Sequence, residues 1–132
     1  MKRSGILHGE LSRLVASLGH GDLLVIGDAG LPIPAGVPAV DLALKPGVPS
    51  FADTVQVVLE ELVVEKGVAN AEQLEVSPEA AAELRKVWLE EVPLERISHE
   101  DLKEMTVRAK AIVRTGEFTP YCNLILVAGV PF

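Results

Sequence analysis

The most informative segment for the architecture of this chain is Leu23-Leu24-Val25-Ile26-Gly27-Asp28. Four consecutive apolar residues that end at glycine and aspartate are typical of a short strand buried on both faces. Such a strand needs helices above and below it, as in a parallel or mixed sheet. Asp28 then lies at the carboxyl end of the strand, which is where ligands bind in open α/β sheets.

The segments on either side of this strand alternate between helical and extended patterns. Ser50, Ser77 and Ser98 each precede an acidic residue and a helical spacing of apolar residues, which predicts an N-cap. We expect helices over residues 10–18, 51–62, 78–90 and 99–112, and strands over residues 23–26, 39–44, 63–65, 94–97 and 124–128. The sequence therefore predicts an α/β fold, a single three-layer domain over residues 1–132 with helices packed on a largely parallel or mixed sheet.

Composition restricts the function. The chain has 132 residues, 48% of them hydrophobic, and a formal net charge of −7, so a nucleic-acid backbone would be repelled. The single cysteine, Cys122, can form no internal disulfide and no cysteine zinc cluster, which favours a reducing cytoplasm. We see no export signal, and no apolar run reaches the roughly 20 residues that span a bilayer.

Two candidate site residues flank the central strand. His20 lies in the turn Gly19-His20-Gly21-Asp22, where two glycines permit unusual backbone angles. The alternative is an ordinary exposed histidine. Asp28 either faces a ligand at the strand end or caps the proline-rich loop that follows through its own backbone.

Further candidates come from the last third of the chain. His99 and Lys103 are four residues apart on a predicted helix and share a face, although both could simply be solvated. Tyr121 and Asn123 alternate in a segment that we expect to be extended, so their side chains point to one side and suit hydrogen bonding to a hydroxylated ligand. Cys122 then points the other way, as a small core residue rather than a nucleophile.

Motifs for common cofactors are missing. The chain has no glycine-rich phosphate loop and no His-Glu-x-x-His, and its three histidines lack metal-ligand spacing. We expect neither a metal nor an organic cofactor.

Five separated motifs carry a family resemblance. They are Leu18-Gly19-His20-Gly21-Asp22, Asp28-Ala29-Gly30-Leu31-Pro32-Ile33-Pro34, Gly47-Val48-Pro49-Ser50-Phe51, His99-Glu100-Asp101-Leu102-Lys103, and Thr115-Gly116-Glu117 with Pro120-Tyr121-Cys122-Asn123 and Ala128-Gly129-Val130. In this order they closely resemble the D-ribose pyranase family, the ribose branch of the ribose pyranase/fucose mutarotase group. The resemblance covers residues 1–62 and 94–132, and Cys122 departs from it, since alanine is common at that position.

The resemblance implies a cytoplasmic isomerase that interconverts the pyranose and furanose forms of D-ribose without a cofactor. It implies His20 as the catalytic residue and a set of substrate-binding residues, Asp28, His99, Lys103, Tyr121 and Asn123. It also implies a homo-oligomer, a decameric ring with sites between neighbouring subunits, and no nucleic-acid or membrane partner.

Ring opening needs one acid and one base, and a histidine serves in either role near neutral pH. Asp28 then orients His20 or binds a sugar hydroxyl, and His99 is a candidate for the second proton-transfer group. The alternatives are a mutarotase for fucose or another sugar, a noncatalytic ribose-binding module, and a structural ring protein whose polar groups only build the subunit contact.

Overall fold

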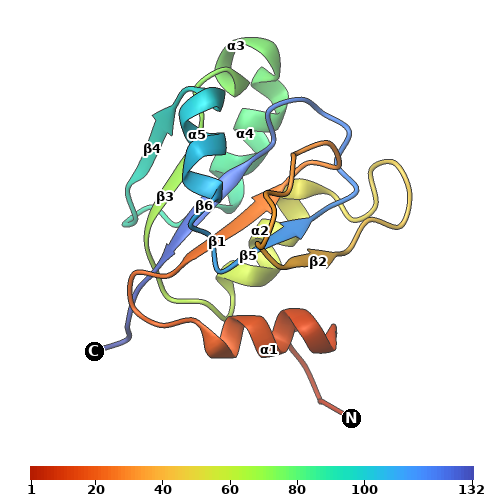
Figure 1. The fold of residues 1–132 in the computed structure, drawn as a ribbon, viewed down its shortest axis with the longest axis vertical. Coiled ribbons are helices and arrows are strands. Elements are labelled where there is room, and N and C mark those ends of the chain that lie inside the picture. The colour runs from red at the N-terminus through yellow and green to blue at the C-terminus, as the bar shows by residue number, and fades with distance from the viewer.

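The computed structural model describes residues 1–132 as five helices around one six-stranded sheet (Figure 1). The helices are α1 (Gly9–Ser17), α2 (Phe51–Leu59), α3 (Gln73–Val76), α4 (Pro78–Val87) and α5 (His99–Thr106). The strands are β1 (Leu23–Gly27), β2 (Ala39–Asp41), β3 (Val64–Asn70), β4 (Leu94–Ile97), β5 (Ala111–Arg114) and β6 (Leu124–Ala128). None of the helices has the length and apolar character needed to cross a membrane.

The sheet is mixed, with the strand order β2-β5-β1-β6-β3-β4. β1 pairs with β5, β2 with β5, and β3 with β4, all in parallel. β6 runs antiparallel to both of its neighbours, β1 and β3. The carboxyl ends of β1, β3 and β4 therefore meet the start of β6 at one edge of the sheet.

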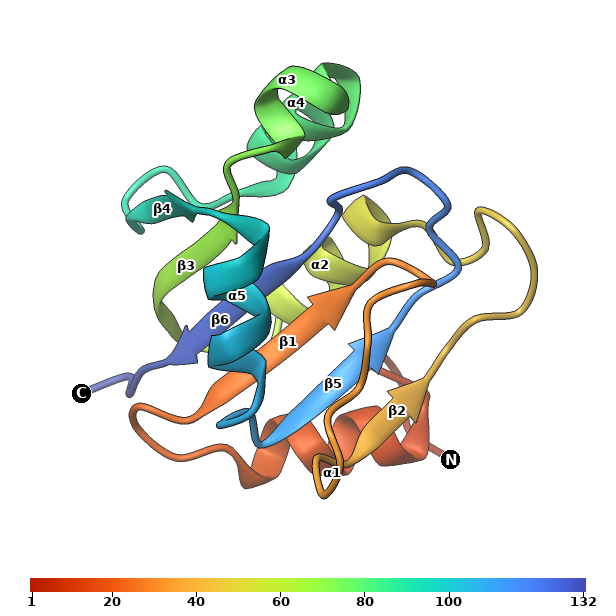
Figure 2. The ribbon, with the colours of Figure 1, turned by 45° about the horizontal axis from the view of Figure 1, so that its top comes forward.

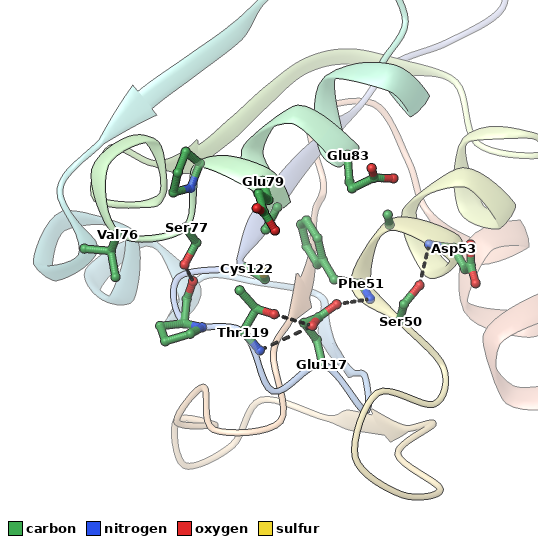
Figure 3. A pocket seen from close by; sticks show the side chains of 14 residues that line it. Ser50, Phe51, Asp53, Val76, Ser77, Glu79, Glu83, Glu117, Thr119 and Cys122 are labelled. Carbon is green, nitrogen blue, oxygen red and sulfur yellow. Dashed lines mark hydrogen bonds between the residues drawn. The ribbon is translucent and has the colours of Figure 1, made fainter.

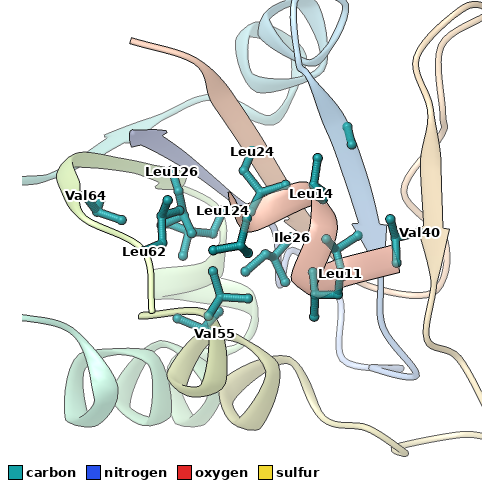
Figure 4. Close-up of a cluster of buried hydrophobic side chains, with 14 of the residues drawn as sticks. Leu11, Leu14, Leu24, Ile26, Val40, Val55, Leu62, Val64, Leu124 and Leu126 are labelled. Atoms are coloured by element: carbon teal, nitrogen blue, oxygen red, sulfur yellow. The ribbon is translucent and has the colours of Figure 1, made fainter. Parts of the chain in front are cut away.

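Alternate side chains of the buried strands pack into two apolar clusters, one on each face of the sheet. Leu24 and Ile26 of β1 face the larger cluster, which α1, α2 and α4 cover (Figure 4). Val25, between them, faces a smaller cluster that is closed by Leu102 of α5 and Leu31 of the proline-rich loop. Figure 2 shows α5 in front of the sheet and α2 behind it. The predicted three-layer α/β fold is confirmed.

Several expected boundaries move because strand pairing overrides local pattern. The helix expected over residues 99–112 ends at Thr106, and residues 111–114 form β5 between β1 and β2. The strand expected over residues 63–65 continues to Asn70, because β4 and β6 pair with it on both sides. The strand expected over residues 39–44 is limited to three residues, Ala39–Asp41.

The three serines expected to cap helices behave differently. Ser50 Oγ accepts a hydrogen bond from Asp53 N at 3.1 Å, and Ser98 Oγ accepts one from Asp101 N at 3.2 Å, so both predicted caps are confirmed. Ser77 makes no cap bond, and its hydroxyl instead donates to the Pro120 carbonyl oxygen at 2.8 Å. Ser77 therefore stands at the N-cap position of α4 as predicted, with Pro78 after it, but its side chain is directed to the 117–122 segment and not to the helix N–H groups.

Candidate active site

Polar side chains from several elements gather where β1, β3 and β4 end and β6 begins. Asp28 follows β1, Asn123 precedes β6, and Asn70 is the last residue of β3. His99 follows β4 by two residues, at the first turn of α5. Strand pairing thus brings together residues that are far apart in sequence.

A chain of hydrogen bonds connects these residues. The backbone N–H of Asp28 donates to Asn123 Oδ1 at 3.0 Å, and Asn123 Nδ2 donates to Asn70 Oδ1 at 3.0 Å. The same Asn70 oxygen lies 3.4 Å from His99 Nδ1. Both asparagines are buried, so the arrangement is held away from competing water.

Asp28 is a half-buried carboxylate at this edge. Burial raises its pKa, while the backbone N–H of Gly30, the side chain of Asn123 and the charge of His99 oppose that shift. Gly30 N donates to Asp28 Oδ1 at 3.0 Å. Asp28 therefore caps the loop that follows β1, and it lies at the carboxyl end of that strand. Ligand binding by Asp28 stays a prediction.

Two neighbours fix the position of His99. Its backbone N–H donates to the Glu72 carboxylate at 2.9 and 3.1 Å, and the Tyr121 ring meets its imidazole edge-to-face, with centroids 5.2 Å apart. Lys103 lies one helical turn further along α5 and pairs with Glu100 at 2.9 Å. The two predicted residues of α5 therefore stand on one side of this helix.

Tyr121 and Asn123 both reach the site, although not by the expected backbone. Tyr121 has a φ of 62°, in the left-handed region, rather than the extended conformation predicted for this segment. Cys122 packs into the main core as expected, and burial raises the pKa of its thiol to about 12. A thiol with that pKa is protonated at neutral pH and is no nucleophile.

His20 lies apart from Asp28 and its hydrogen-bond partners. It precedes β1, whereas Asp28 follows β1, and five strand residues at ~3.3 Å each separate the two positions by roughly 17 Å. His20 Nε2 instead pairs with Glu65 Oε2 at 2.9 Å, and both side chains are exposed. Within one chain Asp28 does not orient His20, and Glu65 does so in its place.

The sequence pattern did not identify three residues that contact the predicted histidines. Glu65 pairs with His20, and Asn70 and Glu72 contact His99. Asn70 and Glu72 were missed because the strand was expected to stop at residue 65. A longer strand through Val68 and Ala69 would have placed an asparagine at the same sheet edge as Asp28. The apolar residues of this longer strand are present in the sequence, but Lys66 and Gly67 interrupt their pattern.

Of the predicted site residues, only Asp28 lines either of the two cavities described here. A cavity of about 660 Å³ lies between the N-termini of α2 and α4 and the 117–122 segment (Figure 3). Apart from the Cys122 thiol, its ionisable side chains are carboxylates, those of Asp53, Glu79, Glu83 and Glu117. Glu117 is occupied there, because it accepts hydrogen bonds from Phe51 N and from Thr119. No imidazole or ammonium group lines this space to donate a proton.

A smaller cavity, of about 350 Å³, includes Asp28, Gly30 and Arg114. It opens beside the polar cluster at the sheet edge. No group of three His, Cys, Asp or Glu side chains is arranged to hold a metal ion.

Known proteins resemble this chain over its whole length. It is 52% identical to the D-ribose pyranase of Bacillus subtilis (strain 168) and 53% identical to that of Symbiobacterium thermophilum, with all of each chain covered. The structure of Bacillus subtilis RbsD complexed with D-ribose matches with a TM-score of 0.95 over all of both chains, at 52% identity. The fucose mutarotase of Streptococcus pneumoniae in complex with L-fucose shares the fold, with a TM-score of 0.84 at 21% identity.

The sequence model of one family covers nearly the whole chain, from residue 1 to residue 131. Full-length identity of about 50% to curated relatives supports the same assignment. This chain belongs to the RbsD / FucU transport protein family.

Proposed function

We propose that this protein is a D-ribose pyranase, an isomerase that interconverts the pyranose and furanose rings of D-ribose. The observation that carries the proposal is the likeness to ribose-bound RbsD, 52% identical with a TM-score of 0.95 and without a gap in coverage. The cluster of Asp28, His99, Tyr121 and Asn123 at one sheet edge supports it, because hydroxyl recognition needs such donors and acceptors.

The reaction asks for proton transfer and positioning alone. A base removes the proton of the anomeric hydroxyl, an acid protonates the ring oxygen, and the bond between the anomeric carbon and that oxygen breaks. Reclosure through another hydroxyl of the open-chain aldehyde gives the other ring size. General acid–base catalysis supplies ~10²- to 10⁴-fold, which suits a reaction that already proceeds in water. No cofactor enters this scheme.

We assign the roles as follows. His20 is the acid/base group, because imidazole titrates near neutral pH and can both give and take a proton. The remaining residues bind sugar hydroxyls: Asp28, His99, Lys103, Tyr121 and Asn123. Burial raises the pKa of Asp28 because its carboxylate has lost hydration, and hydrogen bonds from sugar hydroxyls replace part of that hydration.

The distance along β1 between His20 and Asp28 supports a site shared between subunits. One chain then provides the sheet edge with Asp28, and a neighbouring copy provides His20. We propose a ring-shaped homo-oligomer, a decamer, in which head-to-tail contacts repeat this arrangement. Exposed apolar side chains such as Leu44 and Phe118, at 80% and 69% exposure, offer surface for such contacts. The protein then acts in the cytoplasm, on ribose that has entered the cell.

Magnetisation-transfer NMR on D-ribose at equilibrium tests the activity. We expect catalytic amounts of protein to accelerate pyranose–furanose exchange, and the His20→Ala variant to lose at least about 100-fold of that acceleration. The His8→Asn variant is the matched control, because it removes an exposed histidine and asparagine keeps the helix cap that His8 provides.

Other outcomes would select the alternatives. Ribose binding without faster exchange indicates a binding module. Faster exchange of L-fucose anomers with no effect on ribose indicates a mutarotase. A His20→Ala protein that loses its assembly but keeps its exchange activity contradicts the role of His20.

A further inference from the structure

Asn70 is a fully buried side chain whose amide oxygen lies 3.4 Å from the His99 ring. It ends β3, opposite Ile97 of β4, and its exposed fraction is 0%. Its Oδ1 atom receives the Nδ2 donor of Asn123 and faces His99 Nδ1. The family resemblance assigns it no role.

The directions of these hydrogen bonds follow from one backbone group. The N–H of Asp28 can only donate, so the Asn123 atom that faces it is the oxygen. Asn123 therefore presents its amide nitrogen to Asn70, and the Asn70 atom that receives it is also an oxygen. An amide oxygen can only accept. Nδ1 of His99 lies 3.4 Å from this oxygen, so a hydrogen bond between them requires the proton on Nδ1.

We propose that Asn70 is a positioning residue that holds neutral His99 as the Nδ1–H tautomer. Nε2 of His99 is then the nitrogen with the free lone pair, available to accept a hydrogen bond or a proton from a sugar hydroxyl. Free histidine in water favours the opposite tautomer, so a specific acceptor at Nδ1 is needed. This inference rests on the proposed function for the identity of the ligand, but the tautomer itself does not depend on it.

Two further observations support a functional rather than a structural asparagine. Asn70 Nδ2 is buried and has no hydrogen-bond partner within the chain, which is costly compared with an apolar side chain of similar shape. The rest of His99 is already restrained, by Glu72 at its backbone N–H and by the Tyr121 ring. These contacts do not determine which ring nitrogen of His99 is protonated, and Asn70 adds that constraint.

The tautomer can be read directly by long-range ¹H–¹⁵N NMR of the intact protein labelled with ¹⁵N-histidine. The chain has three histidines, and the spectrum of the His99→Gln variant identifies the signals of His99. Above neutral pH we expect the Nδ1–H form in the wild-type protein and in Asn70→Asp, which keeps an acceptor oxygen. In Asn70→Leu we expect a shift toward the Nε2–H form. A wild-type protein with the Nε2–H form, or a Leu variant with unchanged signals, overturns the proposal.

Ribose exchange gives the second readout. We expect Asn70→Leu to lower kcat about 10- to 100-fold, as is typical when the partner that orients a functional histidine is removed. Thr106→Val is the matched control, because it removes a buried hydroxyl of α5 that bonds only to the Lys103 carbonyl oxygen, and we expect it to stay within about twofold of wild type. Equal losses in both variants would refute a specific role for Asn70. Absence of exchange in the wild-type protein would refute the proposed function and leave the tautomer result standing.

Discussion

At the scale of single residues, Asp28 is a carboxyl whose charged form is disfavoured by folding. Burial raises the pKa of this carboxyl, and the hydrogen bonds from Gly30 and Asn123 only partly offset that shift. A carboxylate whose ionised form is disfavoured in the folded state lowers stability at neutral pH. Functional sites commonly retain such residues at the expense of stability.

We therefore expect Asp28→Asn to raise stability while it lowers activity at least about 10-fold. The wild-type protein loses stability as the pH rises from the ordinary aspartate value of 3.8 through the raised folded value, and asparagine removes that loss. The gain should be full at pH 7 and absent near pH 3, where Asp28 is protonated in both states. Urea unfolding at the two pH values measures it.

Asp41→Asn is the control with the opposite sign. The backbone N–H of Ala43, and then Arg114, lower the pKa of this exposed carboxyl, so its charged form is favoured by folding. We expect its removal to lower stability slightly at pH 7, and this effect to shrink as the pH falls through the lowered folded pKa. A loss of stability at pH 7 in Asp28→Asn would contradict the argument for that residue.

At the scale of elements, three acceptor oxygens form hydrogen bonds with the backbone N–H groups and the threonine hydroxyl in the first turn of α2. Ser50 Oγ accepts from Asp53 N, the Ser50 carbonyl oxygen accepts from the Thr54 hydroxyl, and Glu117 Oε1 accepts from Phe51 N. Glu117 comes from the loop that also carries Tyr121. The start of α2 is therefore tied to the segment that builds one side of the site.

We expect Ser50→Ala to lower the free energy of unfolding by about 1 kcal/mol, because it removes the cap acceptor. Ser50→Asp restores an acceptor oxygen and should recover most of the loss. Chemical denaturation of the three proteins measures both effects. Equal destabilisation by alanine and aspartate would mean that the hydroxyl acts through something other than capping.

At the scale of the whole molecule, the two ends of β1 divide the proposed machinery between different surfaces. His20 and Glu65 lie at one edge of the sheet, and Asp28 with its partners lies at the other. A single subunit of 14.1 kDa then holds two halves of different sites. Light scattering that gives this monomer mass at micromolar concentration would contradict the shared site.

Mixed oligomers provide the sharper test of that division. We expect the His20→Ala and Asp28→Asn proteins each to be weakly active alone. When the two are unfolded together and reassembled, activity should return, because about a quarter of the sites in a random ring combine two intact halves. A mixture of Asp28→Asn with Asn123→Ala is the control, since both changes fall on the same half and no intact site can form. No recovery in the first mixture would place His20 outside the site.

The features that could be predicted from the sequence are those that depend on interactions between residues close along the chain. Runs of apolar residues, their period and the serine caps identified β1, β6, α1 and the starts of α2 and α5, and the pattern of strands and helices defined the fold class. The same local signals misassigned β5, because Ile112 continues a helical spacing and only its neighbours β1 and β2 draw it into the sheet.

Tertiary structure alone decided which polar groups meet. Asn70 and Asn123 are 53 positions apart and Asp28 and Asn123 are 95 apart, and strand register joins them within hydrogen-bond distance. The separation of His20 from Asp28 follows from β1 itself, because an extended strand is the longest path that a short segment can take. Local pattern carries no information about which of these polar side chains meet, since that depends on pairing between distant segments.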